Sequence, residues 1–254
     1  EGNALKIRQK DIRQSFLNVL EAIQNEDSAK MALVYIFYRL IAISKRADAV
    51  YQEVMTHTDN IGILNIDVIL KMLSDHFNHK NSSRLPVIAI YSIYEELISR
   101  IKTYEGKKLQ VLNVHTTSDK HQFGDIEIDN ADGTPFEAVE IKHNIPIDRY
   151  MIVDVTKKAT GSSISKYYIL TTSTPNFTSP EEEAFIRNSI LAIKKNYNLE
   201  IIPNGIFPSL KYYLRFIDDY HHFIQTYSNN LIKDSKISTE VSEELIKLWK
   251  DILK

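Results

Sequence analysis

The chain contains no cysteine, and this absence removes several kinds of site at once. Disulfide bridges, zinc sites with thiolate ligands and cysteine nucleophiles are all excluded. A chain without cysteine suits a reducing compartment, and residues 1–16 lack the apolar run of a signal peptide. We therefore expect a cytoplasmic protein.

Long apolar runs and an excess of one charge are missing as well. The longest apolar run, MALVYIF, covers only residues 31–37, far fewer than the roughly 20 residues that cross a bilayer, so we expect no membrane partner. P-loop, dinucleotide-binding and serine-hydrolase signatures are also absent. The 31 basic and 33 acidic side chains give a net charge of −2, which argues against a protein that passively coats nucleic acid. A DNA-cutting enzyme remains compatible, because metal-binding acids offset a local basic surface.

The composition suits one large domain or two small ones, since 43% of the 254 residues are apolar and 25% are charged. Apolar residues recur at helical spacing over most of residues 4–80, and we expect Ser28 to begin a long second helix. The polar segment 79–86 ends in proline and is the clearest internal break. We therefore expect a helical subdomain over residues 1–82, serving dimerisation or DNA clamping, and a second domain over residues 83–254.

The second domain changes its periodicity along the chain. Pro86 is typical of a helix start, and this helix is expected to run to residue 104. Strands are then expected at residues 109–114, 125–128, 136–142, 167–173 and 199–203. Helices are expected at residues 147–159, 179–197, 208–232 and 238–253. This order predicts an α/β core flanked by helices, with C-terminal helices added to it.

Residues 123–143 predict a hairpin with unusually many charged side chains; their sequence is FGDIEIDNADGTPFEAVEIKH. Side chains alternate between the two faces of a strand, so Asp125 and Glu127 share one face of the first strand. In the second strand Glu140 and Lys142 share the face opposite Val139. Pairing the strands lets Asp125 and Glu140 converge, with Lys142 one pleat further along.

Two carboxylates and an amine are the groups that metal-dependent phosphodiester hydrolysis requires. Mg²⁺ prefers oxygen ligands and commonly binds through one or two carboxylates, keeping other positions for water and phosphate. A neighbouring lysine orients the attacking water. We therefore infer a Mg²⁺ site at Asp125 and Glu140, with Mn²⁺ as a substitute and Lys142 beside it. The alternative is a salt-bridged, solvated face of a sheet.

Asp125, followed after fourteen residues by Glu140-Ile141-Lys142, resembles the signature of the PD-(D/E)xK nucleases, with Gly124 in place of the proline. The order of elements over residues 86–203 is also similar to that of a bacterial type II restriction endonuclease. The resemblance implies a restriction-endonuclease-like mixed sheet flanked by helices. It also implies metal ligation by the two acids and a catalytic lysine. Some members add a glutamate from the preceding helix, here Glu95 or Glu96, and the spacing does not choose between them.

The same resemblance implies a function and partners. We expect magnesium-dependent, sequence-specific cleavage of double-stranded DNA by a homodimer in the bacterial cytoplasm, with a cognate DNA methyltransferase in the same system. The alternative is a non-cleaving DNA-binding or assembly module of a larger restriction-modification or defence protein. A third option is a nuclease acting on RNA or on branched or modified DNA.

Two further segments are candidates for DNA contact. The loop HTTSD offers His115, Thr116, Thr117 and Ser118, side chains of types that bind phosphates and base edges; an ordinary polar loop is the alternative. Lys211 lies near an expected helix start, where a phosphate is readily bound. The apolar residues around Lys211 are more simply explained as core.

Overall fold

The computed structural model describes residues 10–24, 26–112, 123–237 and 240–254. The chain divides into two compact units, residues 1–50 and residues 51–254, and each unit is described by itself. Residues 51–82, which we expected in the helical subdomain, lie in the second unit. Among the described residues, no helix is both long enough and apolar enough to cross a membrane.

The first unit consists of two helices in its described part. α1 (Lys10–Ala22) is followed by α2 (Glu26–Asp59), which starts before the expected Ser28 and continues into the second unit. Large apolar side chains of α2 are exposed on all sides of the helix: Met31, Leu33, Val34, Tyr35, Ile36, Phe37, Tyr38, Leu40, Ile41 and Ile43. A helix that is apolar all round is normally a buried helix.

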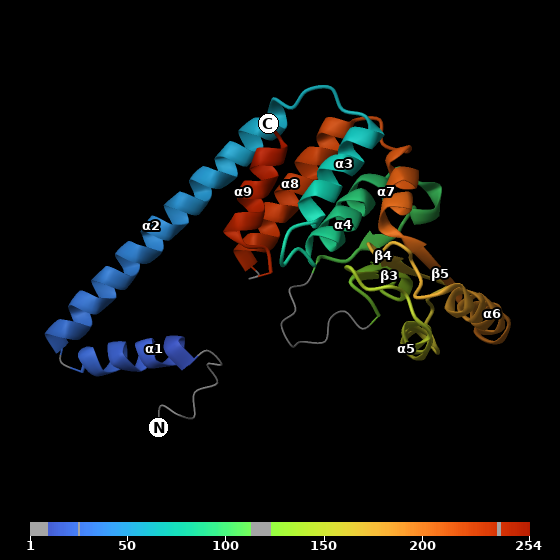
Figure 1. Ribbon diagram of the computed structural model, residues 1–254, viewed down its shortest axis with the longest axis horizontal. Helices are drawn as coiled ribbons and strands as arrows, with labels where there is room; N and C mark the ends of the chain where they lie inside the picture. Colours follow the sequence, from blue (N-terminus) through green and yellow to red (C-terminus); the bar gives the residue numbers. More distant parts are fainter. Residues whose placement is uncertain (1–9, 25, 113–122, 238–239) are drawn as a thin grey trace. The chain divides into compact units, whose positions relative to one another are not determined.

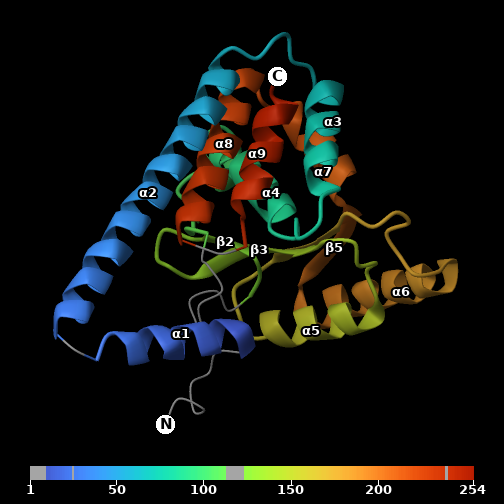
Figure 2. The same ribbon diagram turned by 60° about the vertical axis from the view of Figure 1, so that its left-hand side comes forward.

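The second unit has three layers, with a sheet between two sets of helices (Figures 1 and 2). The larger helical layer consists of α3 (Ile66–Phe77), α4 (Leu85–Leu97), α7 (Ile206–Leu214), α8 (Tyr220–Ile237) and α9 (Glu243–Ile252). α4 is buried along nearly its whole length, because it packs against α3, α7 and α8. α3 in turn packs against α7 and α9.

The described residues form a five-stranded sheet in the order β1-β2-β3-β4-β5. Its strands are β1 (Lys108–Leu109), β2 (Ile126–Asp129), β3 (Pro135–Lys142), β4 (Lys166–Thr171) and β5 (Glu200–Gly205). β1, β2 and β3 pair antiparallel, whereas β3, β4 and β5 pair parallel. The expected mixed α/β sheet with N-terminal and C-terminal helices is therefore confirmed.

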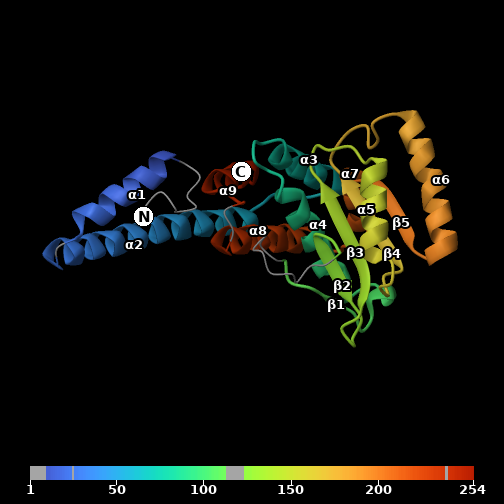
Figure 3. The ribbon, with the colours of Figure 1, turned by 90° about the horizontal axis from the view of Figure 1, so that it is seen from below.

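The second helical layer connects the parallel strands. α5 (Arg149–Ala159) follows β3, and α6 (Pro180–Tyr197) follows β4. Asp148 caps α5 and Ser179 caps α6, each accepting a hydrogen bond from the backbone of the first turn. Apolar side chains of both helices and of the strands form a core between these layers. Figure 3 shows α6 on the side of the strands opposite α8.

Three expected elements have different limits in the structure. Of the strand expected at 109–114, only Leu109 belongs to a strand; residues 110–112 do not, and the remainder lies outside the described residues. The helix expected to reach residue 104 ends at Leu97, and a 3₁₀ helix covers Lys102–Tyr104. The helix expected over 208–232 is two helices, because Asp219 accepts hydrogen bonds from the backbone of His221 and His222 and so caps a new start.

Candidate active site

The register of β2 and β3 brings the two acids of the hairpin together. Ile126 pairs with Val139, and continuing this register by one residue sets Asp125 opposite Glu140. The carboxylate Oδ2 of Asp125 accepts a hydrogen bond from the backbone amide of Ile141 at 2.7 Å. The acid before β2 is therefore bound directly to the strand that carries Glu140 and Lys142.

Side chains alternate between the two faces of β3 as expected. The face that carries the charged side chains is covered by α5 and α6 rather than exposed to solvent. Glu140 and Lys142 lie on the same face as Ala138, which is buried in the core under α5 and α6. Val139 and Ile141 are buried on the opposite face. Asp125, Glu140 and Lys142 are all half-buried, and Lys142 forms an ion pair with Glu140. The metal site and the salt-bridged sheet face therefore both stay predictions.

The charges of these three groups are coupled. Burial raises the pKa of Asp125, and the nearby carboxylate of Glu140 raises it further; the Ile141 amide, Lys142 and Arg84 oppose the shift. Lys142 Nζ donates a hydrogen bond to Glu140 Oε1 at 2.5 Å. Within the described residues, Asp125 Oδ1 and Glu140 Oε2 have no hydrogen-bond partner.

This donor set fits a hard divalent cation held by two protein ligands. Two like charges in a partly desolvated space repel each other, and a cation between them removes that repulsion. No group of three or more histidine or acidic side chains suited to a metal occurs in the described part of the chain. Asp125 and Glu140 would therefore hold Mg²⁺ together with water and phosphate oxygens, a common arrangement for this ion.

The loop before β2 is held in position by a third acid and a tyrosine. Glu127 Oε1 accepts hydrogen bonds from the backbone amides of Phe123 at 2.8 Å and Gly124 at 3.2 Å. The hydroxyl of Tyr167 on β4 donates to the Phe123 carbonyl. A Cβ atom at Gly124 would lie 2.7 Å from the carbonyl oxygen of Val139, so only glycine permits this approach. Glu127 therefore holds the two residues before Asp125 in position.

Two basic residues near the acids had no signal in the sequence. Arg84 lies close enough to lower the pKa of Asp125, although it belongs to the polar break before α4. Burial lowers the pKa of Lys158 on α5, but its pair with Asp154 and the nearby Glu140 raise it more, so the net shift is upward. Arg84 and Lys158 are distant in sequence from the two acids and come near them only in the folded chain, so sequence spacing does not reveal them.

The two helix glutamates lie elsewhere, with contacts to α8. Glu95 accepts a hydrogen bond from Asn230. Glu96 accepts one from Thr226 at 2.7 Å and pairs with His222 at 2.7 Å. Neither glutamate joins Asp125 and Glu140 in a described group that is suited to a metal.

Of the expected DNA-contact residues, Lys211 lies in the described part of the chain. Lys211 pairs with Asp67 at 3.1 Å, and both side chains are exposed. The loop residues His115, Thr116, Thr117 and Ser118 lie outside the described residues.

No family model matches this chain, and a search of the curated proteins finds no match. Function is therefore inferred from the geometry around Asp125, Glu140 and Lys142.

Proposed function

We propose that this chain is a magnesium-dependent endonuclease that hydrolyses phosphodiester bonds in double-stranded DNA, of the sequence-specific type II kind. Its fold would be restriction-endonuclease-like, with Asp125, Glu140 and Lys142 as the PD-(D/E)xK set. The observation that carries the proposal is the hydrogen bond from the Ile141 amide to Asp125. This bond brings an acid from one strand to the Glu-Ile-Lys segment of the next.

Each side chain has a distinct role in this proposal. Asp125 Oδ1 and Glu140 Oε2, which lack partners among the described residues, would hold Mg²⁺ or Mn²⁺. The bound metal would lower the pKa of a water molecule and neutralise charge that develops on the scissile phosphate. Lys142 lies beside Glu140 and would orient the attacking water through its ammonium group.

One observation favours the alternative of a DNA-binding or assembly module that does not cut. Lys142 forms an ion pair with Glu140 at 2.5 Å, two residues apart on the same strand. This pair neutralises one acid without a metal, as a purely structural sheet face would. Such a module would shift DNA in a gel with or without Mg²⁺ and leave it unbroken.

We also propose that the chain forms a homodimer through its N-terminal unit. Between residues 29 and 44 the charged side chains are Lys30 and Arg39 alone, while the apolar side chains of α2 are exposed on all sides. Exposed apolar surface of this extent marks an interaction site, and a second copy supplies an equally apolar face. A two-fold dimer also presents two active sites to the two strands of DNA. A cognate DNA methyltransferase would be the further partner of such an enzyme.

Digestion of a defined supercoiled plasmid tests the proposed activity. Mg²⁺ should support cutting at fixed positions, Mn²⁺ should replace it, and EDTA should stop it. Asp125→Asn and Glu140→Gln should each slow cutting by roughly 10³-fold, since loss of the metal's charge stabilisation removes several kcal/mol. Asp132→Asn is the matched control, because Asp132 is an exposed acid in the turn of the same hairpin.

The outcomes distinguish a metal-dependent nuclease from a DNA-binding module that does not cut. Cutting that persists in EDTA, or that survives Asp125→Asn at the wild-type rate, contradicts the metal site. Binding of the plasmid without any nicking under all metal conditions favours the non-cleaving module. Parallel reactions with RNA, branched DNA and methylated DNA identify the substrate class.

A further inference from the structure

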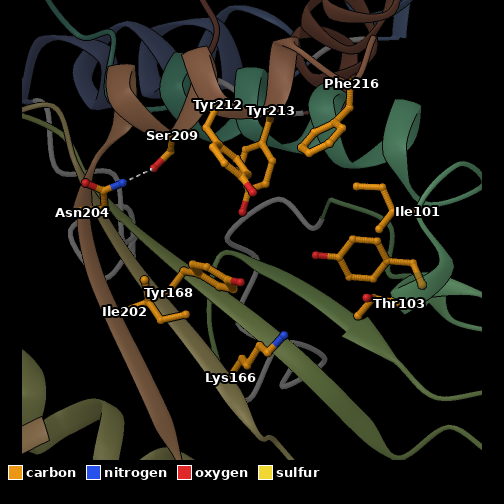
Figure 4. Close-up of a pocket in the computed structure, with 11 residues that line it drawn as sticks. Ile101, Thr103, Lys166, Tyr168, Ile202, Asn204, Ser209, Tyr212, Tyr213 and Phe216 are labelled. Atoms are coloured by element: carbon orange, nitrogen blue, oxygen red, sulfur yellow. Dashed lines mark hydrogen bonds between the residues drawn. The ribbon is translucent and has the colours of Figure 1, made fainter.

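A cavity of about 350 Å³ lies on the face of the sheet opposite the candidate active site. Lys166 and Tyr168 of β4 form part of its floor, and Tyr212 and Phe216, from α7 and the residues after it, form part of its roof (Figure 4). Lys166 pairs in register with Glu137. It therefore lies on the face opposite Glu140, since neighbouring residues of β3 alternate. The volume is within the range of about 300–1,000 Å³ that is typical of small-molecule sites.

The floor of this cavity carries a half-buried cation. Lys166 is half-buried, its amine points into the cavity (Figure 4), and it forms no ion pair with any described residue. Its register partner Glu137 is buried, and Glu137 Oε1 is occupied by the hydroxyls of Tyr94 at 2.8 Å and Tyr104 at 3.0 Å. Burial raises the pKa of Glu137, and the nearby charge of Lys166 opposes this shift. The Lys166 amine forms no ion pair with that carboxylate, so it can still donate to an anion inside the cavity.

The roof supplies aromatic rings, and Arg215, which does not line the cavity, packs against them. The Arg215 guanidinium lies 4.1 Å from the ring centre of Tyr212 and 4.4 Å from that of Phe216. Arg215 has no acidic partner within the described part of the chain. Tyr212 is 53% exposed and Phe216 38% exposed, so both rings are accessible. Rings of this kind stack with nucleobases, whose faces are planar.

Polar groups at the cavity wall complete the pattern. Asn204 Nδ2 donates a hydrogen bond to Ser209 Oγ at 3.0 Å, which leaves Asn204 Oδ1 as an acceptor. The hydroxyl of Tyr168 also points into the cavity (Figure 4). The Tyr168 hydroxyl can therefore meet a polar edge of a planar ligand.

We infer that this cavity binds a single nucleotide, with its base against Tyr212 and Phe216 and its phosphate at Lys166. A cationic ligand is disfavoured because it would meet the Lys166 ammonium. A purely apolar ligand would bury this ammonium without a ligand partner, which is unfavourable. The inference goes beyond the proposed cleavage, because these groups lie on the other face of the sheet and need no metal. A free nucleotide and a nucleotide unstacked from a DNA strand share this chemistry.

Isothermal titration of the purified chain tests the inference. The probes are the four deoxynucleoside monophosphates, the matching nucleosides, inorganic phosphate and a short single-stranded oligonucleotide. We expect saturable binding of a monophosphate or of the oligonucleotide. Lys166→Met should weaken this binding roughly tenfold or more, because it removes a charge-assisted contact. The matched control Lys195→Met, at an exposed lysine of α6, should bind as the wild type does.

A second variant protects the test from a folding artefact. Tyr212→Leu removes a stacking ring from an exposed position and leaves Lys166 in place. It should also weaken nucleotide binding. Thermal melting of each variant reports whether it is folded. Binding by the oligonucleotide alone identifies a nucleotide within a strand as the ligand. The inference is overturned if no probe binds, if Lys166→Met or Tyr212→Leu binds as the wild type does, or if inorganic phosphate binds as tightly as the nucleotide. Because the readout is binding, the result does not depend on whether the chain cuts DNA.

Discussion

The carboxylate of Asp125 is hydrogen-bonded to the backbone amide of Ile141 at 2.7 Å. Ile141 lies between Glu140 and Lys142, so this bond fixes the acid from the first strand against the acid and the amine of the second. The bond uses one oxygen of Asp125, and the other has no partner among the described residues. Both the proposed chemistry and the predictions for its variants follow from this arrangement.

The lysine of the hairpin should be required for cleavage and dispensable for DNA binding. Lys142→Ala is expected to slow plasmid cutting in Mg²⁺ by about 10²–10⁴-fold, the usual contribution of a positioned proton-transfer or water-orienting group. Gel-shift affinity should change little, because Lys142 is half-buried and already paired with Glu140. Normal cutting by Lys142→Ala would remove this residue from the catalytic set.

The glycine before Asp125 should tolerate no side chain. In Gly124→Ala the new Cβ would lie 2.7 Å from the Val139 carbonyl oxygen, a backbone atom, so the loop before β2 must shift. We expect a loss of about 1–3 kcal/mol in the free energy of unfolding, measured by urea denaturation, together with loss of cutting. Gly62→Ala is the control, since nothing lies within 4 Å of its Cβ position. Equal stability of the two variants would contradict this account.

The buried ion pair between α4 and α8 should be essential to stability. Arg84 donates to Asp234 Oδ2 at 2.9 Å and 2.8 Å, and both side chains are 3% exposed. Arg84→Met should lower the free energy of unfolding by about 3–5 kcal/mol, because the Asp234 carboxylate stays buried without its partner. Lys71→Met breaks the exposed pair with Asp75 and should cost no more than about 1 kcal/mol.

The double variant Arg84→Met/Asp234→Leu sharpens this prediction. It removes both charges and fills the space with apolar atoms, so it should recover much of the lost stability. A double variant as unstable as Arg84→Met alone would show that packing around Arg84, and not the stranded charge, causes the loss.

The stability of the helical layer should fall in mild acid because of His76. Burial lowers the pKa of His76 to about 4 from its ordinary value of 6.5. The neutral ring is hydrogen-bonded to Tyr227 and to the Leu245 carbonyl. Between pH 6.5 and pH 4, His76 therefore binds a proton in the unfolded chain but stays neutral in the folded chain. The contribution of neutral His76 to the free energy of unfolding is fully present above pH 6.5 and is lost as the pH falls toward 4. Its magnitude is on the order of 3 kcal/mol.

Urea denaturation between pH 4 and pH 7 measures this effect, with His76→Gln as the comparison. The variant has no ring to protonate, so its stability should decline less steeply than that of the wild type over this range. Parallel pH profiles for the two proteins would assign the acid sensitivity to other groups.

The apolar surface of α2 should hold two copies together. Phe37 is 55% exposed in the middle of this surface, and Phe37→Glu would put a charge where the partner must be apolar. We expect analytical ultracentrifugation to find a dimer for the wild type and a monomer for this variant. Leu191→Glu, at a 69% exposed position of α6, should remain a dimer. A monomeric wild-type chain would exclude the second copy as the occupant of this surface.

The sequence predicts those features that depend on local periodicity. Alternation along β2 and β3 correctly separates Asp125, Glu140 and Lys142 from Val139 and Ile141, because this pattern follows from the geometry of a strand alone. The helix start expected at residue 179 is local as well, and Ser179 caps that helix. These features specify both the hairpin and the α/β order of the second unit.

Features that depend on distant partners were missed. Glu137 is buried on the apolar face because Tyr94 and Tyr104, from the helical layer, donate to it, and strand alternation contains no sign of them. Glu95 is another example, since its partner Asn230 comes from α8. The expected helix over 208–232 also missed the break at Asp219, whose carboxylate accepts from the backbone of His221 and His222.

The position of the hairpin in the sheet has a consequence for regulation of the site. Asp125 precedes β2, a four-residue strand whose outer neighbour β1 has two residues, whereas Glu140 and Lys142 belong to the interior strand β3. Local opening of β1 and β2 would detach one acid while the parallel strands stay paired, at a smaller free-energy change than complete unfolding. A cation bound across the two strands opposes that opening, so it would slow amide hydrogen exchange in β2 before it changes exchange in β4.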